Sequence, residues 1–149
     1  MKPTLAGSDT FWNQSDAFRH AGDAAFTLTR ASDYVGEVRI PCVFLYFRCI
    51  ELALKSVLIY HGIPERDITG RLGHRISALL GEAQKFPQFT TLGLTMADRQ
   101  LVDRFSEAYS DKWFEYPEDS LADYPDLETS KDLAKRLCAA TRSYERPTS

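Results

Sequence analysis

Residues 38–61 read VRIPCVFLYFRCIELALKSVLIYH, and the rest of the chain is expected to pack around them. It is too long for a β-strand and is apolar on nearly every side, which is typical of a helix in the middle of a packed bundle. We therefore expect a central helix at about residues 36–61. With about 100° between successive residues, one narrow sector of this helix carries charge. We call this row the charged seam; it consists of Arg48, Glu51 and Lys55.

The charged seam has two interpretations. It can be a row of internal or half-exposed salt bridges, because Glu51 follows Arg48 by three residues and precedes Lys55 by four. It can also be a polar row that faces a ligand in a crevice of the bundle. The sequence leaves both open, so all three residues are candidate ligand-binding residues.

Length and composition indicate one ordinary globular domain over residues 1–149, with frayed ends at 1–7 and 147–149. The formal net charge of −3 argues against a wholly basic nucleic-acid binder. The three cysteines stand in no metal-ligand spacing, so we expect reduced, buried thiols, no metal ion and no cofactor. The most apolar window, residues 40–47, is far shorter than the ~20 residues that cross a bilayer, and no signal peptide is visible. We therefore expect a cytoplasmic protein with no membrane contact.

Helical periodicity recurs along the chain, which predicts an all-α, up-and-down bundle of four to five helices. The first helix is expected from Ser8 or Asp9 to about Ala31, with Leu28 on its apolar side. A third helix should begin at Gly73-His74 and end at Pro87. Thr95 and Asp98 should cap a fourth helix, and we assign Met96 to the apolar side of that helix. An acidic crossover at residues 111–132 and a last helix from about Leu127 to Tyr144 complete the chain.

His74 is the histidine with the strongest indication of a site. It lies between Arg71 and Arg75 and beside Gly73 at an expected helix start, where two guanidinium groups and the helix N-terminus favour a phosphate or carboxylate. The alternative is structural: His74 caps its helix, or it hydrogen-bonds an acid such as Glu51 and fixes how two helices dock. Separately, we expect the charged seam to dock against the turn that bears His74.

Two segments carry a resemblance to a known family. Residues 48–62 read RCIELALKSVLIYHG, and residues 72–80 read LGHRISALL. Together they resemble the HEPN domain family of prokaryotic α-helical bundles, one branch of which has a central Ile-Glu-Leu-Ala-Leu-Lys helix followed by a Gly-His helix start. Residues 113–117, WFEYP, resemble the late Tyr-Pro stretch of that branch, whereas Arg75 stands where Asp is common.

The resemblance implies a four- or five-helix bundle, a homodimer, and a role in RNA cleavage, toxin–antitoxin or anti-phage systems, or nucleotide binding. Ribonuclease members need an Arg followed by four to six residues and then His. The positions that would hold this Arg before His74 are Asp67, Ile68 and Thr69, and His20 and His61 have no such Arg either. The first hypothesis is therefore a non-catalytic HEPN-like module that binds a nucleotide, RNA or a cognate protein. The second is a divergent, metal-independent ribonuclease that uses His74 with Arg71 or Arg75, with Arg48 and Glu51 nearby. The third is a small-ligand pocket beside Lys55 and His74 that binds a nucleotide.

Overall fold

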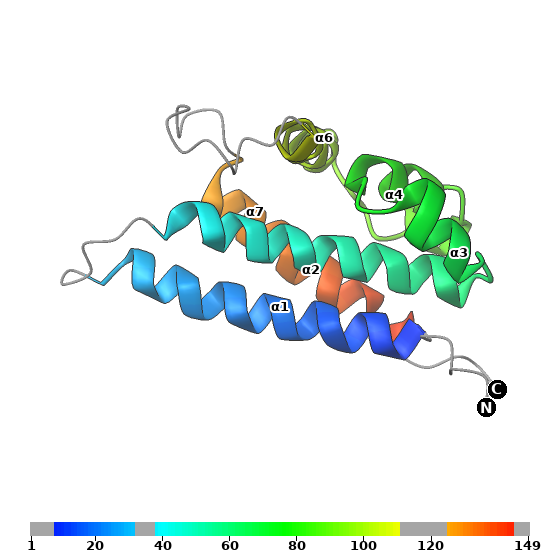
Figure 1. The fold of residues 1–149 in the computed structure, drawn as a ribbon, viewed down its shortest axis with the longest axis horizontal. Helices are drawn as coiled ribbons and strands as arrows, with labels where there is room; N and C mark the ends of the chain where they lie inside the picture. The colour runs from blue at the N-terminus through cyan, green and yellow to red at the C-terminus, as the bar shows by residue number, and fades with distance from the viewer. Residues whose placement is uncertain (1–7, 32–37, 111–124, 145–149) are drawn as a thin grey trace.

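The structure is an all-α helical bundle, as predicted. It is a computed structural model that describes residues 8–31, 38–110 and 125–144, and every regular element within those ranges is helical. The helices are α1 (Ser8–Thr29), α2 (Arg39–Tyr60), α3 (Glu65–Asp67), the π-helical turn η1 (Ile68–Leu72), α4 (Ile76–Ala83), α5 (Pro87–Thr90), α6 (Met96–Ser110), α7 (Leu127–Ala140) and the 3₁₀ turn η4 (Thr141–Tyr144). Helices α1 and α2 run antiparallel side by side, and α7 packs against both (Figure 1).

Helix α2 is the centre of the bundle, which confirms the prediction for this stretch. Every residue from Cys49 to Leu58 is buried, including the charged Glu51 and Lys55. Residues 36 and 37 of the expected helix lie outside the described ranges. The helix ends where Gly62 takes a φ of +88°, a conformation that glycine adopts without strain, and Pro64 follows. None of the described helices combines the length and the apolar character needed to span a membrane.

Helices α1 and α2 approach closely at a glycine. A Cβ atom added to Gly22 would lie 2.6 Å from Cε1 of Tyr46, so only glycine allows this spacing. The Tyr46 hydroxyl then donates a hydrogen bond of 2.7 Å to Oδ1 of Asp23 on α1. The small residues around Gly22 therefore let the aromatic ring of Tyr46 be buried between the two helices.

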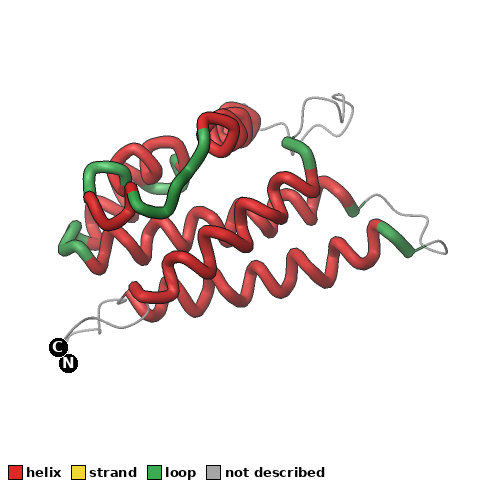
Figure 2. The backbone as a smooth tube through the Cα atoms, turned by 180° about the vertical axis from the view of Figure 1, so that it is seen from behind, coloured by secondary structure: helices red, strands yellow, loops and turns green. Residues whose placement is uncertain are grey.

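Helices α4 and α6 form a second layer over α2. In Figure 1, α6 is seen end-on, so it runs across the direction of α1 and α2; Figure 2 shows the same arrangement from behind. The Phe105 ring of α6 stacks on Phe47 of α2, with ring centres 4.0 Å apart and planes inclined by 3°. Ser77 at the start of α4 is bonded to α6, because its N–H donates to Ser106 Oγ (3.0 Å) and its hydroxyl to Asp103 (2.8 Å).

The start of α6 is the capping box predicted from the sequence. The Asp98 N–H donates to Thr95 Oγ1 at 3.1 Å, and the Thr95 N–H donates to Oδ2 of Asp98 at 2.9 Å. The same carboxylate accepts two hydrogen bonds from Arg136 of α7, at 2.6 and 3.1 Å. Asp98 therefore both begins α6 and joins it to the long-helix layer.

Several expected details are wrong. The third helix begins at Ile76 and not at Gly73-His74, because a tight turn precedes it, and Pro87 begins the short helix α5 as a residue well suited to a first helical position. Met96, the first residue of α6, is 70% exposed, and Leu28 is 44% exposed, whereas Phe26, two residues earlier on α1, is buried. The α-helical part of the last helix ends at Ala140. Residues 111–124 of the acidic crossover and both frayed ends lie outside the described ranges.

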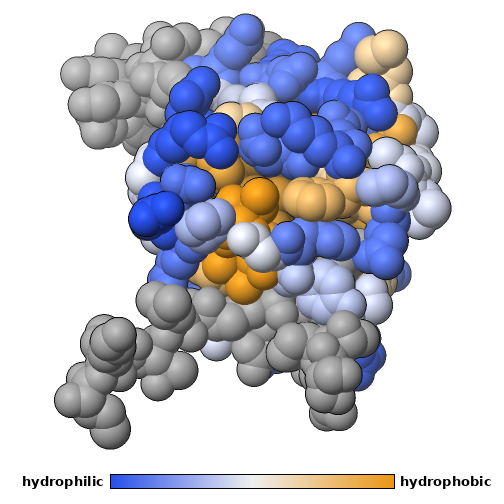
Figure 3. Space-filling view, turned by 90° about the vertical axis from the view of Figure 1, so that its right-hand side faces the viewer, coloured by the Kyte–Doolittle hydropathy of each residue, from blue (hydrophilic) through white to orange (hydrophobic). Residues whose placement is uncertain are grey.

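Figure 3 views the end of the bundle that lies on the right of Figure 1. Hydrophobic residues gather near the middle of this face, and polar residues surround them. A separate hollow of about 400 Å³ is lined by Tyr60 of α2, residues next to and within α5, and the end of α7. The charged seam lies elsewhere, on the side of α2 that faces α4 and α6.

Candidate functional site

The candidate site begins with a buried ion pair on α2. Glu51 and Lys55 are each only 4% exposed, and the Lys55 ammonium nitrogen lies 3.1 Å from Oε2 of Glu51. A carboxylate removed from water is costly unless cations and hydrogen-bond donors surround it. The first interpretation of the charged seam, an internal row of salt bridges, is confirmed for this pair.

Arg48 completes the seam from the other side of Glu51. Its Nη1 atom donates to the same oxygen, Oε2, and its guanidinium carbon lies 5.8 Å from the centre of the Phe18 ring of α1. That distance is within the range of a cation–π contact. Arg48 is thus fixed between a carboxylate and an aromatic ring, while about 30% of its side chain stays exposed.

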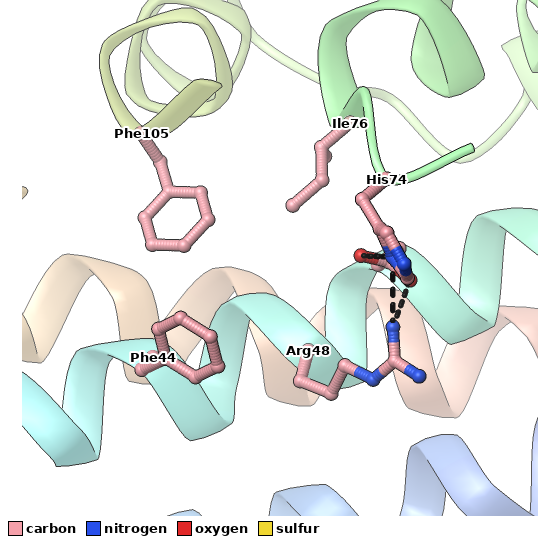
Figure 4. Close-up of a pocket in the computed structure, with 6 residues that line it drawn as sticks. Phe44, Arg48, His74, Ile76 and Phe105 are labelled. Atoms are coloured by element: carbon pink, nitrogen blue, oxygen red, sulfur yellow. Dashed lines mark hydrogen bonds and ion pairs between the residues drawn. The ribbon is translucent and has the colours of Figure 1, made fainter. Parts of the chain in front are cut away.

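A tight turn brings His74 to the seam. The Arg75 N–H donates to the Leu72 carbonyl at 3.0 Å, which closes a four-residue β-turn, and Gly73 has φ +51° and ψ −125°. These angles are those of the first central residue of a type II′ turn, a position that favours glycine strongly. The residue after that glycine, His74, is directed onto α2, where its Nδ1 atom lies 3.2 Å from Oε2 and 3.3 Å from Oε1 of Glu51 (Figure 4).

The contact with Glu51 decides the tautomer of His74. An ionised carboxylate only accepts hydrogen bonds, so Nδ1 carries the hydrogen and donates it to Glu51. The Nη1 atom of Arg48 lies 3.3 Å from the same Nδ1 and has a second hydrogen to donate, but a lone pair on Nδ1 would face both carboxylate oxygens of Glu51, so the hydrogen is assigned to Nδ1. The Nε2 atom of His74 is consequently the acceptor, and in the described part of the chain it has no hydrogen-bond partner, while the side chain is 58% exposed.

These groups form one wall of a cavity of about 150 Å³. Its lining residues are Phe44, Arg48, Glu51, His74, Ile76 and Phe105. Figure 4 shows the polar groups of Arg48 and His74 at one end and the rings of Phe44 and Phe105 at the other, with Ile76 between them on the α4 side. The two rings meet edge to face, with centres 6.3 Å apart. The cavity therefore offers hydrogen-bond donors next to an aromatic surface.

No protein-family model, curated protein or solved structure matches this chain. The HEPN resemblance therefore stays a prediction, and the geometry of the cavity is the basis for any functional conclusion. Within residues 8–31, 38–110 and 125–144, no group of three or more His, Cys, Asp and Glu side chains is placed to hold a metal ion.

The structure brings together some of the predicted site residues and separates others. Arg48, Glu51 and His74 meet at the cavity, whereas Lys55 reaches it only through Glu51. Arg71 does not line the cavity; its Nη1 atom lies 3.5 Å from Oε1 of Glu82 on α4. Arg75 is exposed beside the start of α4 and does not line the cavity either.

Sequence reasoning missed the apolar half of the cavity. Phe44 falls in the same helical sector as the charged seam, which signals that it shares the exposure of that face. Ile76 and Phe105 have no comparable signal, because periodicity assigns each to the apolar side of its own helix and does not say which helix faces which. Only the packing of α4 and α6 on α2 brings them to the seam.

Proposed function

We propose that this chain is a non-catalytic, HEPN-like binding module whose cavity receives a ligand with an anionic group and a flat apolar ring. A nucleotide or the end of an RNA chain has this chemistry. The proposal includes a cytoplasmic homodimer that serves a toxin–antitoxin or anti-phage system, as the family resemblance implies. The observation that carries it is the surplus of positive charge beside two phenylalanine rings.

The charge surplus follows from how Glu51 is used. Both of its oxygens are occupied: His74 lies beside both, and Lys55 and Arg48 contact Oε2. Two permanent cations thus surround one carboxylate, and of these Arg48 is the cation that lines the cavity. A phosphate near Arg48 would gain charge-assisted hydrogen bonds. Glu51 would not repel it as an unpaired carboxylate would, because both of its oxygens already have partners.

The aromatic wall supports a ring-bearing ligand. Phe105 is held flat against Phe47, so its position is fixed before any ligand binds. Phe44 adds a second ring within the same hollow. A base inserted beside these rings would gain stacking energy, whereas inorganic phosphate would use only the polar half. The volume of about 150 Å³ suits one ring with its polar substituent and not a long chain.

Calorimetric titration tests the proposal with a nucleoside monophosphate, the matching nucleoside and inorganic phosphate. The nucleotide should bind more tightly than either fragment, and Arg48→Gln should weaken its binding by about tenfold or more, because a charged hydrogen bond contributes about 1.5–3 kcal/mol. Arg71→Gln is the matched control, since Arg71 lies outside the cavity and pairs with Glu82. Absence of binding by nucleotides and short RNAs, or equal weakening by both variants, would contradict the proposal.

A second function, metal-independent RNA cleavage, has one observation in its favour. Glu51 orients His74 through Nδ1 and leaves Nε2 as an acceptor, which is the arrangement of a general base and its orienting carboxylate. Cleavage of a mixed RNA pool by the purified chain separates the two functions. Activity that disappears in His74→Ala and persists in His20→Ala would establish a ribonuclease, because His20 lies on α1 outside the cavity. The non-catalytic proposal predicts no cleavage by any of the three proteins.

A further inference from the structure

A group of buried polar side chains occupies the junction of α1, α2 and α7, apart from the cavity. Ser15 of α1 donates a hydrogen bond of 2.7 Å to the Cys49 carbonyl, and its hydroxyl lies 3.3 Å from Sγ of Cys49. The Cys138 thiol of α7 lies 3.7 Å from Oδ1 of Asp16. Ser15, Cys49 and Cys138 are all buried, and none of them lines the candidate site.

The two thiols of this junction lie on facing turns of α2 and α7. Sγ of Cys49 lies 3.9 Å from the carbonyl oxygen of Ala134, one helical turn before Cys138 on α7, and the two thiols contact consecutive residues of α1, Ser15 and Asp16. The two cysteines are separated by most of the chain, but they lie at the same level of neighbouring helices. Their sulfur atoms can therefore meet after rotation of the side chains.

The two thiols are unequal. The neighbouring Cys49 lowers the pKa of Cys138, with help from Ser15 and Arg19 and against the opposing effects of burial and the Asp16 carboxylate. Cys138 and burial raise the pKa of Cys49. The thiolate is the reactive form of cysteine, so Cys138 is the better nucleophile of the pair.

Cys42 provides an internal comparison. It is buried too, but its thiol donates to the Gly22 carbonyl at 3.3 Å, and burial raises its pKa to about 11. It lies two helical turns before Cys49 on α2 and has no thiol neighbour among the described residues. Of the three cysteines of the chain, only two are therefore arranged as a pair.

We propose that Cys49 and Cys138 are an oxidisable pair that hydrogen peroxide converts into a disulfide between α2 and α7. The Cys138 thiolate attacks one peroxide oxygen, the O–O bond breaks, and the departing hydroxide takes up a proton to become water. The sulfur of Cys49 then attacks the resulting sulfenic acid; the S–S bond forms, the S–O bond breaks, and a second water leaves with the proton of Cys49. Two thiols lose two electrons and two protons, and one peroxide becomes two waters.

Mass spectrometry of the folded wild-type chain tests this directly. After treatment with peroxide, the chain is denatured and its free thiols are alkylated. Before alkylation, the expected product is lighter than the reduced chain by two hydrogens. After alkylation it carries a single alkyl group, at Cys42. Proteolysis then yields a fragment in which the Cys49 and Cys138 peptides are joined. Three alkyl groups, a disulfide that involves Cys42, or cross-linked dimers would overturn the proposal.

Two variants test the order of the steps. Cys49→Ser removes the resolving thiol, so Cys138 should accumulate as a sulfenic acid that dimedone labels. Cys42→Ser should leave the disulfide and its rate of formation unchanged. Labelling of Cys42 in place of Cys138 in the Cys49→Ser variant would overturn the assignment of Cys138 as the attacking thiol. The wild-type peptide map decides which cysteines pair, even where a variant does not fold.

Discussion

The Nδ1 atom of His74 lies 3.2 Å from Oε2 of Glu51, although the two residues are 23 positions apart in the chain. This contact joins the central helix to the turn before α4 and closes one end of the cavity. It confirms the structural interpretation of His74, in which the histidine bonds an acid of the charged seam and fixes how two helices dock. The same contact orients the imidazole towards the cavity, so the pair that docks the two helices also lines the proposed binding site.

The turn that carries His74 depends on Gly73. Gly73→Ala should reduce the free energy of unfolding by about 1–3 kcal/mol, because an L-residue is strained at φ +51° and ψ −125°. It should also displace His74 and shift its imidazole NMR signals. Gly81→Ala is the control: Gly81 lies within α4 with nothing near its added Cβ, so alanine should stabilise the helix by about 0.5–1 kcal/mol. Unchanged His74 signals in Gly73→Ala would contradict this account of the turn.

The ion pair of α2 should respond unequally to loss of its two partners. Glu51→Leu leaves the Lys55 ammonium buried without an anion and should cost about 3–5 kcal/mol of stability in urea unfolding. Lys55→Met should cost less, because Glu51 keeps Arg48 and His74 as partners. A larger loss in Lys55→Met than in Glu51→Leu would show that Arg48 and His74 do not stabilise the carboxylate.

The close approach of α1 and α2 makes Gly22 sensitive to substitution. Gly22→Ala should destabilise the chain by about 1–3 kcal/mol, because the new methyl group would overlap the Tyr46 ring, which is buried and bonded to Asp23. Thermal unfolding measures the effect, and Gly81→Ala again serves as the comparison. A stabilised Gly22→Ala would mean that the two helices are further apart than the structure shows.

The stability of the α6–α7 junction should depend on pH. Arg136 holds the pKa of Asp98 below its usual range. The pair therefore stabilises the folded chain fully when the pH is above the ordinary aspartate pKa of about 4. This stabilisation is lost as the pH falls through the lower pKa that Asp98 has in the folded chain. Asp98→Asn should therefore cost about 1.5–3 kcal/mol at neutral pH. The difference from wild type should shrink in acid. Asp132→Asn is the matched control, because Asp132 bonds the same arginine at the surface and should change stability little.

Local sequence patterns predicted the features that depend on one helix and its caps. The capping box of Thr95 and Asp98, the burial of residues 49–58 and the charges of the seam all follow from helical spacing and cap chemistry. The site itself was predicted in part, because the seam and the Gly73-His74 turn were both visible and were expected to meet.

The rest of the site depends on contacts between helices that periodicity does not specify. Phe105 reaches the cavity because α6 crosses α2, and Ser77 fixes that crossing through Ser106 and Asp103. The sequence shows that Phe105 is apolar but not that it faces Phe44. In the same way, Arg71 lies only three residues before His74 but pairs with Glu82, because the turn at Gly73 separates the directions of their side chains.

The tautomer of His74 in the wild-type chain shows whether Glu51 holds this histidine at the cavity. Nitrogen-15 NMR of the imidazole, assigned by comparison with His74→Gln, distinguishes the two neutral forms. We predict that Nδ1 carries the hydrogen and that a bound nucleotide shifts the Nε2 signal. A neutral imidazole with its hydrogen on Nε2 would contradict the contact between Glu51 and His74 and, with it, this account of the site.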